Sequence, residues 1–191
     1  MGDFDVRLAW AFTGAGHFLR EAVGIVESLR GSAAVDVFLS RAASEVLSVY
    51  GLSERLSRCA ASVTAESGYS FPSISGLAAG RYGALVIAPA TGNTVAKCAR
   101  GIADSLVSCM FAQGGKSRVP ICVLPTDVSP EMASSAPNGA VIKVYPRKID
   151  IELSRRIGEM DGVTSVLSPD ALRSWTDGLM KGSSEYRHAA G

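Results

Sequence analysis

The chain has 191 residues, of which 47% are hydrophobic and 19% are charged, and its formal net charge is +1. Disordered chains combine low hydrophobicity with high net charge, so this composition excludes a largely disordered protein. The balanced charge also argues against nucleic acid and anionic membranes as partners, and the length fits a single domain.

Strands and helices alternate along the first third of the sequence. Apolar runs of strand length are each followed by a segment whose apolar residues recur at helical spacing. Glycines and Pro72 mark turns between residues 68 and 80. The predicted elements here are a strand at 6–12, a helix at 17–30, a strand at 34–39, helices at 43–50 and 53–59, and a short strand at 62–65.

The most apolar predicted strand, residues 84–88, is expected to end at Pro89. A long helix is predicted over about 94–112, because apolar residues again recur at helical spacing. Near the end of the chain, Ser168-Pro169-Asp170 is typical of a helix start, with a capping serine and proline at the first helical position. The remaining predicted elements are strands at 119–124, 140–145 and 163–167 and helices that begin at 150 and 169.

This alternation predicts a three-layer α/β/α fold with a doubly wound, Rossmann-like parallel sheet. Several of the strands are apolar throughout, which indicates a parallel sheet covered by helices on both faces. In such folds, ligands bind beyond the carboxyl ends of the strands, where the strand order reverses. The rule selects four segments: 13–17, 40–42, 89–94 and 125–127.

The cysteines and the chain ends indicate a cytoplasmic protein. The four cysteines have neither C-x-x-C pairing nor histidines at metal-ligand spacing, so we expect free thiols and no metal site. Residues 1–5 do not resemble a signal peptide, and no apolar run approaches the roughly 20 residues of a membrane span. We expect residues 1–182 to form the domain and the small, polar residues 183–191 to be a flexible tail.

The turn Thr13-Gly14-Ala15-Gly16 is a candidate anion site. Backbone amides at such a strand-to-helix turn can hold a phosphate, although the segment can equally be a plain tight turn. A dinucleotide motif would need glycine at Leu19 and an acidic residue at Ser40. A hydroxyl at Ser40 favours a mononucleotide, because a carboxylate there would repel a phosphate.

The segment from Pro89 to Lys97 is the second candidate. Asn93, Lys97 and Gly101 are expected to lie along one side of the predicted helix near its start. Asn93 or Thr94 can also serve simply as the N-cap. A lysine in the first turn opposes the helix dipole, so it indicates a nearby anion, either a ligand phosphate or an acid such as Asp104.

The second segment carries a family resemblance. Pro89-Ala90-Thr91-Gly92-Asn93-Thr94, with its continuation over 96–106, closely resembles the P-A-S-A-N-T element of the homo-oligomeric flavin-containing cysteine decarboxylase superfamily. Residues 10–17 resemble that family's first strand and phosphate turn, and Ser40 resembles its hydroxyl at the second strand. The likeness covers about residues 6–150 and points to the archaeal flavoprotein and dihydromethanopterin reductase branch.

The resemblance implies bound FMN, a flavodoxin-type sheet, and a homo-oligomer that is a trimer or a multiple of trimers such as a dodecamer. FMN would lie between subunits. Thr91, Asn93 and Thr94 would bind the polar edge or ribityl chain of the flavin. The residues implied in cofactor binding are Thr13, Gly14, Ala15, Gly16, His17, Ser40, Pro89, Ala90, Thr91, Asn93, Thr94 and Lys97.

The sequence also departs from the decarboxylase pattern. Residues 67–73 contain no histidine where the decarboxylases have a catalytic one, and residues 125–132 do not match their P-x-M-N-x-x-M-W substrate clamp. Both differences argue against decarboxylation and favour redox chemistry. Ferredoxin-type cysteine clusters are missing too, so electrons would come from a separate donor: a flavin reductase, NAD(P)H or ferredoxin.

Several single residues have two interpretations. His17 can be a neutral donor to FMN or a histidine that caps its own turn. Asp127 is the candidate catalytic residue and can hold the amino-pyrimidine of a pterin, or it can simply form a turn. Tyr69, Phe71 and Tyr82 can stack on a ring from a neighbouring subunit, although most aromatic residues serve packing. Arg100 and Asp104 are expected to form an ion pair on the predicted helix.

Together these observations predict an FMN-dependent oxidoreductase that reduces dihydromethanopterin to tetrahydromethanopterin with electrons from an external donor. The protein would only bind, orient and tune the flavin. Two alternatives stay open: an electron-transfer flavoprotein linked to ferredoxin, and a flavin-dependent decarboxylase of a cysteine-containing substrate.

Overall fold

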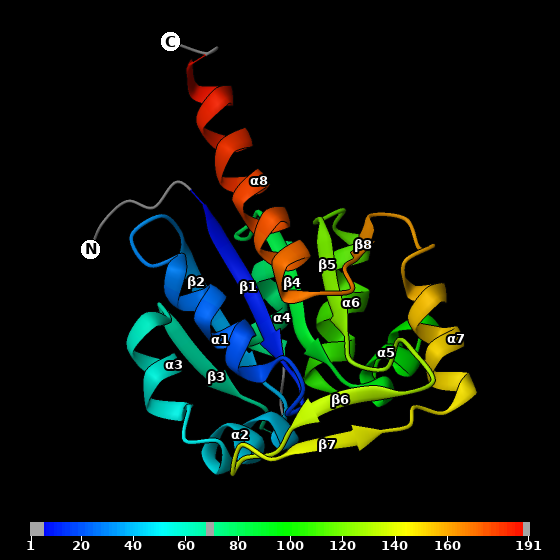
Figure 1. The fold of residues 1–191 in the computed structure, drawn as a ribbon. Helices are drawn as coiled ribbons and strands as arrows, with labels where there is room; N and C mark the ends of the chain where they lie inside the picture. The colour runs from blue at the N-terminus through cyan, green and yellow to red at the C-terminus, as the bar shows by residue number, and fades with distance from the viewer. Residues whose placement is uncertain (1–5, 68–70, 189–191) are drawn as a thin grey trace.

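The computed structural model describes residues 6–67 and 71–188, and a six-stranded parallel sheet forms its centre (Figure 1). The strand order is β3-β2-β1-β4-β5-β8, and every neighbouring pair is parallel. These strands are β1 (Arg7–Phe12), β2 (Ala34–Leu39), β3 (Ser62–Ala65), β4 (Ala84–Ala90), β5 (Ile121–Pro125) and β8 (Val163–Ser165).

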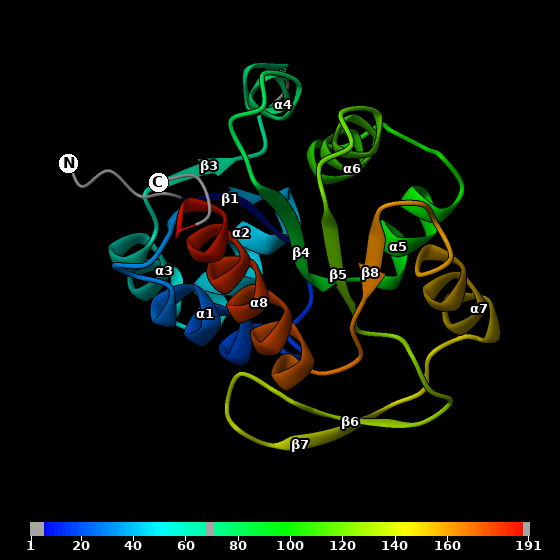
Figure 2. The same cartoon turned by 90° about the horizontal axis from the view of Figure 1, so that it is seen from above.

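Helices cover both faces of the sheet (Figure 2). One core contains residues of α1 (Leu19–Ser28), α2 (Arg41–Val49), α3 (Ser53–Cys59) and α8 (Pro169–His188). The other contains residues of α4 (Phe71–Ala78), α5 (Gly92–Ala99), α6 (Leu106–Lys116) and α7 (Lys148–Ile157).

Side-chain alternation along β1 decides which core each residue enters. Leu8, Trp10 and Phe12 pack in the core with α1, whereas Ala9 and Ala11 pack in the core with α6. Successive residues of a strand point to opposite faces, so one strand supplies bulky side chains to one layer and small ones to the other. All five are fully buried, as an all-parallel sheet requires.

The predicted doubly wound α/β fold is confirmed, with one refinement of the strand order. β3 lies beside β2, so the parallel strands follow the Rossmann order 3-2-1-4-5-6. The flavodoxin-type order, in which the third strand lies on the other side of the first, does not describe this sheet. The order reverses between β1 and β4, which places the expected ligand site at their carboxyl ends.

The predicted long helix over 94–112 is wrong, because the chain forms two helices there. α5 ends at Ala99, and Gly101 follows with a left-handed φ of 74°. Ser105 then starts α6 with a capping box, in which its side chain accepts from the amide of Ser108. A glycine in the left-handed conformation and a strong N-cap override the continuous apolar periodicity.

Two smaller expectations need correction. Residues 71–78, expected as turns, form α4, with Pro72 in the first turn, where proline is tolerated. β4 does not stop at Pro89 but continues to Ala90 through a cis Ala88–Pro89 bond. α8 continues as a helix to His188, whereas the domain boundary at residue 182 stays a prediction.

A separate hairpin lies along the carboxyl edge of the sheet (Figures 1 and 2). The predicted strand at 140–145 is present as β7 (Val141–Val144), and it pairs with β6 (Met132–Ser135), which the sequence analysis did not predict. The two strands are antiparallel and make no strand pairs with the main sheet. The hydroxyl of Tyr50 donates to the carbonyl of Ser135 over 2.8 Å and so ties the hairpin to the end of α2.

A buried carboxylate in β2 joins three other segments of the fold. Asp36 is 4% exposed and accepts hydrogen bonds from Arg7 and Ser62, each at 2.7 Å, and from Tyr82 at 3.1 Å. Burial alone would raise the pKa of Asp36, but these hydrogen bonds and the Arg7 charge together hold that pKa below its ordinary value. Asp36 is therefore ionised in the folded protein at neutral pH.

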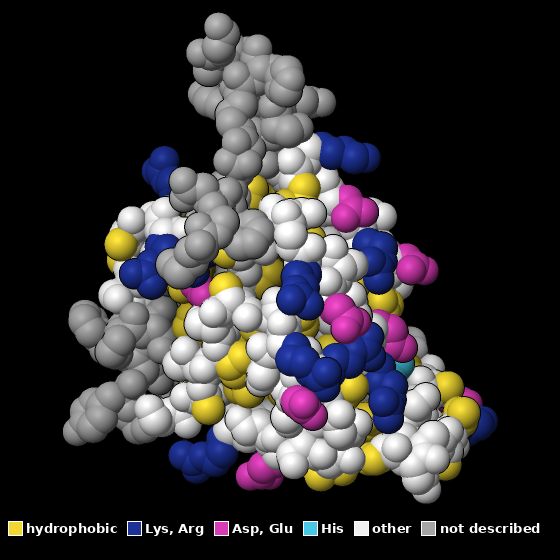
Figure 3. Space-filling model, turned by 90° about the vertical axis from the view of Figure 1, so that its left-hand side faces the viewer, with side chains coloured by type: hydrophobic (Ala, Val, Ile, Leu, Met, Phe, Trp, Pro, Cys, Tyr) yellow, Lys and Arg dark blue, Asp and Glu magenta, His cyan; other side chains and the backbone are white. Residues whose placement is uncertain are grey.

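The surface carries charges of both signs close together. On the face turned to the viewer in Figure 3, basic and acidic side chains lie beside one another. Arg55 of α3 pairs with Glu27 of α1, and Arg58 pairs with Glu54. Within residues 6–67 and 71–188, no helix is both long and apolar enough to cross a membrane.

Candidate functional site

Thr13 links the ends of β1 and β4 where the strand order reverses. Its Oγ1 donates to the carbonyl of Pro89 over 2.8 Å and accepts from the amide of Thr91 at 2.9 Å. The Thr13 amide donates to the same carbonyl at 3.3 Å. Thr13 is 1% exposed, so its hydroxyl fixes the two strand ends relative to each other.

The turn after β1 leaves backbone amides available to a ligand. The amides of Gly14, Gly16 and His17 donate to no group in the described part of the chain, whereas the Ala15 amide bonds to the Thr13 carbonyl at 2.8 Å. α1 begins directly after this turn, and Phe18, its N-cap, offers no side-chain cap. Free amides ahead of a helix N-terminus attract an anion.

Both glycines of this turn pack closely against α2. A Cβ on Gly14 would lie 2.5 Å from the Cβ of Ala42, and a Cβ on Gly16 would overlap the hydroxyl of Tyr50. The absence of side chains thus lets the turn approach α2. This contact places the start of α2 beside the amides of the turn.

Ser40 lies at the end of β2 and caps α2. Its amide donates to the carbonyl of Phe12 at 3.1 Å, and its Oγ accepts from the amide of Ala43 at 3.1 Å. The hydroxyl predicted at this strand end is therefore present, and its acceptor function is used by the helix.

A carboxylate that the sequence analysis missed stands next to Ser40. The amide of Glu66, just after β3, donates to the carbonyl of Leu39 at 2.8 Å, which brings Glu66 to the end of β2. Its side chain accepts from the amide of Arg41 at 3.1 Å and from the amide of Leu106 at 2.6 Å. One carboxylate thus caps both α2 and α6.

The start of α5 is held by Thr91 and Asp127. Thr91 is the N-cap, and its side chain accepts from the Thr94 amide at 3.4 Å and donates to the Thr94 hydroxyl at 3.1 Å. The amide of Gly92 donates to Oδ2 of Asp127 at 2.9 Å. Asn93 and Thr94, the N-caps considered from sequence, lie inside the helix, and Asn93 is exposed.

Lys97 does not lie in a first helical turn as predicted, but Asp104, one of the two anions suggested for it, is its partner. Because α5 ends at Ala99, Lys97 lies in its last turn, where a cation is favourable. Its Nζ contacts Oδ1 of Asp104 at 2.8 Å, and this pairing lowers the pKa of Asp104. Asp104 therefore pairs with Lys97 and not with Arg100, and Gly101 lies beyond the helix.

A cavity of about 220 Å³ lies between the carboxyl ends of the strands and the hairpin. The main sheet and its turns form one side, and β6 and β7 form the other. A hollow of about 170 Å³ shares Gly16, His17 and Ser134 with it and extends to Arg20 and Tyr50. The cavity is lined by Ala15, Gly16, His17, Thr91, Thr126, Asp127, Met132, Ser134 and Val144.

Two titratable side chains face this cavity. Burial lowers the pKa of His17, against the opposing influence of the Glu21 and Asp127 carboxylates, so the imidazole is neutral at neutral pH. Oδ2 of Asp127 accepts from the Thr126 hydroxyl at 3.0 Å besides the Gly92 amide, whereas Oδ1 has no partner in the described chain. Asp127 thus anchors α5 with one oxygen and offers the other to a ligand.

The structure brings five of the residues predicted from sequence to the cavity and places the others around it or away from it. Ala15, Gly16, His17, Thr91 and Asp127 line the cavity. Thr13, Pro89 and Ala90 are buried directly behind them, and Ser40 lies one strand away. Of the other predicted residues, Gly14, Asn93, Thr94 and Lys97 do not line it. Thr126 lies in the predicted segment 125–127, whereas Met132, Ser134 and Val144 in the cavity and Tyr50 in the adjoining hollow were missed.

The aromatic residues suggested for stacking do not reach this cavity in the described chain. Tyr82 is 6% exposed, packs edge-on against Phe38 and donates to Asp36, so it belongs to the core. Tyr69 and the side chain of Phe71 lie outside what the structure describes. Burial raises the pKa of Tyr82, which keeps its hydroxyl protonated as a donor.

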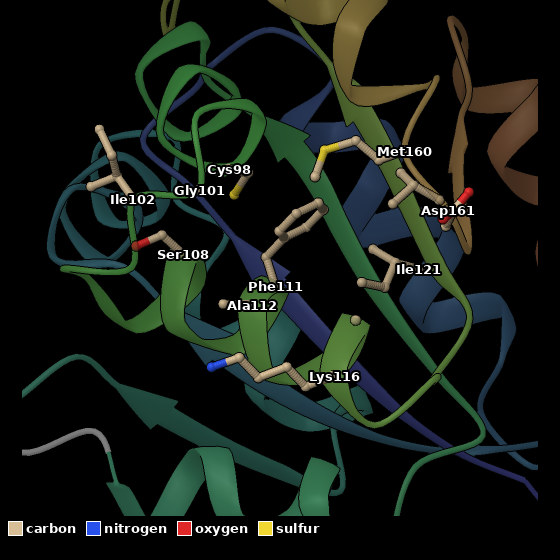
Figure 4. A pocket seen from close by; sticks show the side chains of 12 residues that line it. Cys98, Gly101, Ile102, Ser108, Phe111, Ala112, Lys116, Ile121, Met160 and Asp161 are labelled. Carbon is tan, nitrogen blue, oxygen red and sulfur yellow. The ribbon is translucent and has the colours of Figure 1, made fainter.

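A second cavity, of about 190 Å³, lies far from the strand carboxyl ends (Figure 4). Ile121 and Val163, the first residues of β5 and β8, lie in its wall, as do Phe111 and Met160. The lining is largely apolar, with Lys116 and Asp161 among its few charged residues. It offers no set of amides or hydroxyls for a phosphate. No group of three or more potential metal ligands occurs in the described residues.

Comparison with known proteins shows which family this chain resembles in sequence. The family model described as Flavoprotein matches residues 3–185. The dihydromethanopterin reductase (acceptor) of Methanosarcina mazei is 40% identical over 154 residues, which are 75% of this chain and 61% of the reductase. The reductase of the same description from Methanocaldococcus jannaschii is 38% identical over 133 residues, 64% of this chain and 54% of that protein. The chain therefore spans less than two thirds of either reductase.

Solved structures show the same fold. Burkholderia xenovorans DmrB in complex with FMN, described as a cubic protein cage for redox transfer, is 35% identical, with a TM-score of 0.83 over 95% of this chain and 98% of that one. A dodecameric FMN-dependent UbiX-like decarboxylase from Escherichia coli O157:H7 is 17% identical, with a TM-score of 0.64 over 84% and 79% of the two chains. The second likeness concerns the fold alone.

Proposed function

Because the chain belongs to the flavoprotein family, we propose that it binds FMN at the carboxyl ends of β1, β4 and β5 and reduces dihydromethanopterin with electrons from a separate donor. The observation that supports dihydromethanopterin as the substrate is the 40% identity to a dihydromethanopterin reductase over 75% of the chain. The cavity at the strand ends supports the location.

The residues at this edge fit a phosphorylated flavin. The free amides of Gly14, Gly16 and His17 offer donors to a phosphate without adding charge. A neutral His17 extends this donor set, and the hydroxyls of Thr91 and Ser134 suit an uncharged polar chain. The buried Thr13, Pro89 and Ala90 would hold the turn and α5 in register beneath the ring.

When bound, FMN would supply the transfer of electrons between donor and substrate. The chain's own residues would bind, orient and exclude water. Oδ1 of Asp127 is free to accept from a ring N–H of a pterin or to pass a proton, while Oδ2 stays bonded to the Gly92 amide. The hairpin would close the cavity over the substrate with Met132 and Val144.

The proposal includes partners. By analogy with the cubic cage of DmrB, this chain would assemble into a homo-oligomer in which a second copy completes the flavin pocket. The electron donor would be a flavin reductase, NAD(P)H or ferredoxin.

The test starts with the purified protein. We expect a yellow solution with a flavin spectrum, and uptake of FMN by any cofactor-free fraction. Photoreduced protein mixed anaerobically with dihydromethanopterin should regain the oxidised flavin absorbance as tetrahydromethanopterin appears. Steady-state rates should give parallel double-reciprocal lines, because donor and substrate would use the same flavin in turn. A colourless protein that takes up no FMN would refute the proposal.

Lys97 offers a check on which residues hold the cofactor. We expect Lys97→Met to change the FMN dissociation constant less than threefold, because the lysine pairs with Asp104 and does not line the cavity. Fluorescence titration of the cofactor-free protein with FMN measures this. A loss of tenfold or more would place Lys97 at the phosphate after all.

The alternative of an electron-transfer flavoprotein has one observation in its favour. The chain spans only 61% and 54% of the two reductases, so the likeness covers only part of each of those proteins. If the chain only carried electrons, photoreduced protein would reduce ferredoxin but leave dihydromethanopterin unchanged. The same anaerobic assay therefore separates the two functions.

A further inference from the structure

Arg20 is a cation without an acidic partner at the edge of the proposed cofactor site. It lies in the first turn of α1, its side chain is exposed, and it makes no ion pair within the described part of the chain. Its Cζ lies 5.4 Å from the centre of the Tyr50 ring. Stacking of a guanidinium on an aromatic face favours one orientation of this flexible side chain before any ligand arrives.

Tyr50 holds the guanidinium from a fixed position. Its hydroxyl donates to the carbonyl of Ser135 at 2.8 Å, which ties the ring to the hairpin. The same hydroxyl lies where a Cβ on Gly16 would be, so the ring also packs against the turn after β1. Arg20 is therefore connected through one aromatic ring to the turn whose amides are free.

The hollow of about 170 Å³ brings Arg20 and two of these amides to one space. Gly16 and His17, whose amides have no acceptor in the described chain, line it together with Arg20 and Tyr50. Helical side chains lean toward the N-terminus of their helix, so Arg20 leans toward the turn. The hollow shares Gly16, His17 and Ser134 with the larger cavity. A ligand in the cavity can therefore place one end in the hollow.

The charges at this edge make a cation important for a phosphate. A phosphate monoester carries a charge of about −1.5 to −2 at pH 7, whereas backbone amides carry no net charge. Glu21 lines the hollow and Asp127 lines the cavity, while the imidazole of His17 is neutral. Among the described residues that line the two spaces, Arg20 is the one cation. Without it, the two carboxylates would repel a phosphate at the turn.

We propose that Arg20 binds the phosphate of FMN, that Tyr50 positions its guanidinium, and that this pair makes the site prefer FMN to riboflavin. The proposal rests on the proposed function, since it takes FMN as the ligand of the neighbouring cavity. The phosphate would accept from the amides of the turn and from the guanidinium together. The planar N–H groups of arginine match phosphate oxygens, and riboflavin has no such group to offer.

Fluorescence titration of the cofactor-free protein with FMN and with riboflavin tests this without turnover. We expect the wild-type protein to bind FMN about tenfold or more tightly than riboflavin, because bonds to a charged group are the stronger ones. Arg20→Met should lose most of this preference and bind riboflavin normally. The matched control Arg30→Met removes an exposed arginine just beyond the other end of α1 and should keep the wild-type preference.

Two variants of Tyr50 test its positioning of the guanidinium. Tyr50→Phe keeps the ring and loses the hydrogen bond to Ser135, whereas Tyr50→Leu loses both. We expect the ratio of the FMN and riboflavin dissociation constants to stay as in wild type in Tyr50→Phe and to move toward one, about threefold or more, in Tyr50→Leu. A loosened hairpin would weaken both flavins alike and leave this ratio unchanged. An unchanged ratio in Tyr50→Leu would reject the positioning by Tyr50.

Other outcomes overturn the assignment of Arg20: equal binding of FMN and riboflavin by the wild type, no binding of either, an unchanged preference in Arg20→Met, or an equal loss in Arg30→Met. Thermal unfolding of Arg20→Met should give a Tm close to that of wild type, since the side chain is exposed. The reduction assay stands apart. The expected binding pattern without reduction of dihydromethanopterin rejects the proposed reductase and keeps Arg20, whereas reduction with an unchanged preference in Arg20→Met does the reverse.

Discussion

Replacing Gly14 with alanine is expected to weaken FMN binding at least tenfold. The new Cβ would lie 2.5 Å from the Cβ of Ala42, which is attached directly to the backbone of α2 and cannot swing aside. Relief therefore requires α2 to move away from the turn, which disturbs the amides of Gly14 and Gly16 together with Ser40. Overpacking of this kind typically costs about 1–3 kcal/mol of stability. Quenching of FMN fluorescence measures the affinity, and urea denaturation measures the stability.

A compensating change tests the reason for this effect. Ala42→Gly removes the opposing Cβ, so the double variant Gly14→Ala/Ala42→Gly should regain most of the lost FMN affinity. Gly115→Ala is the matched control, because a Cβ there meets no atom within 4 Å. Wild-type affinity in Gly14→Ala, or no recovery in the double variant, would contradict the packing explanation.

Replacing Asp36 with alanine should lower the free energy of unfolding by about 2–4 kcal/mol at pH 7. The substitution removes the acceptor of Arg7, Ser62 and Tyr82 at once. Arg7 is partly exposed and can regain water, but the Tyr82 hydroxyl is buried and loses its partner. Urea denaturation of both proteins at pH 7 gives the difference.

The difference in the free energy of unfolding between wild type and Asp36→Ala should change with pH in a definite direction. Because folding lowers the pKa of Asp36, its contribution is fully present above the ordinary aspartate pKa of about 4 and disappears as the pH falls through the lower folded value. The gap between wild type and Asp36→Ala should therefore shrink below about pH 4. The control Asp104→Ala, which breaks an exposed ion pair, should cost clearly less at pH 7. A gap that stays constant down to pH 2 would rule out a role for the Asp36 charge.

Much of the fold could be predicted because its four central strands, β2, β1, β4 and β5, are buried on both faces. Residues 34–39 are all buried, and such a run has no solvent-facing side to confuse its assignment. The rule that ligands gather at the carboxyl ends of parallel strands then brought Gly16, Thr91 and Asp127 together, although they are far apart in sequence.

The errors came from local signals that compete with periodicity. Apolar spacing continues across the break between α5 and α6, and only the left-handed Gly101 and the capping Ser105 interrupt it. Lys97 was accordingly assigned to the wrong end of a helix. Because α5 is short, Lys97 lies near its C-terminus, where a cation is favourable. The helix propensities of the residues do not by themselves give the length of α5.

β6 and Glu66 escaped prediction for a different reason. β7 was predicted from its alternation, whereas its partner β6 is small and polar after Met132 and has no apolar run like those of the other strands. Glu66 contacts amides that are 25 and 40 residues away, and only the assembled fold brings them together. Side chains that join distant segments leave no periodic trace in a sequence.

The position of Glu66 makes the two helical layers dependent on each other at the ligand edge. α2 packs on one side of the sheet and α6 on the other. The first residue of each helix, Arg41 or Leu106, donates its amide to the carboxylate of Glu66. A shift of α2 that draws Glu66 along withdraws the acceptor from Leu106. Movements at the glycine turn can therefore reach the opposite surface of the protein through a single side chain, without any change in the strands between them.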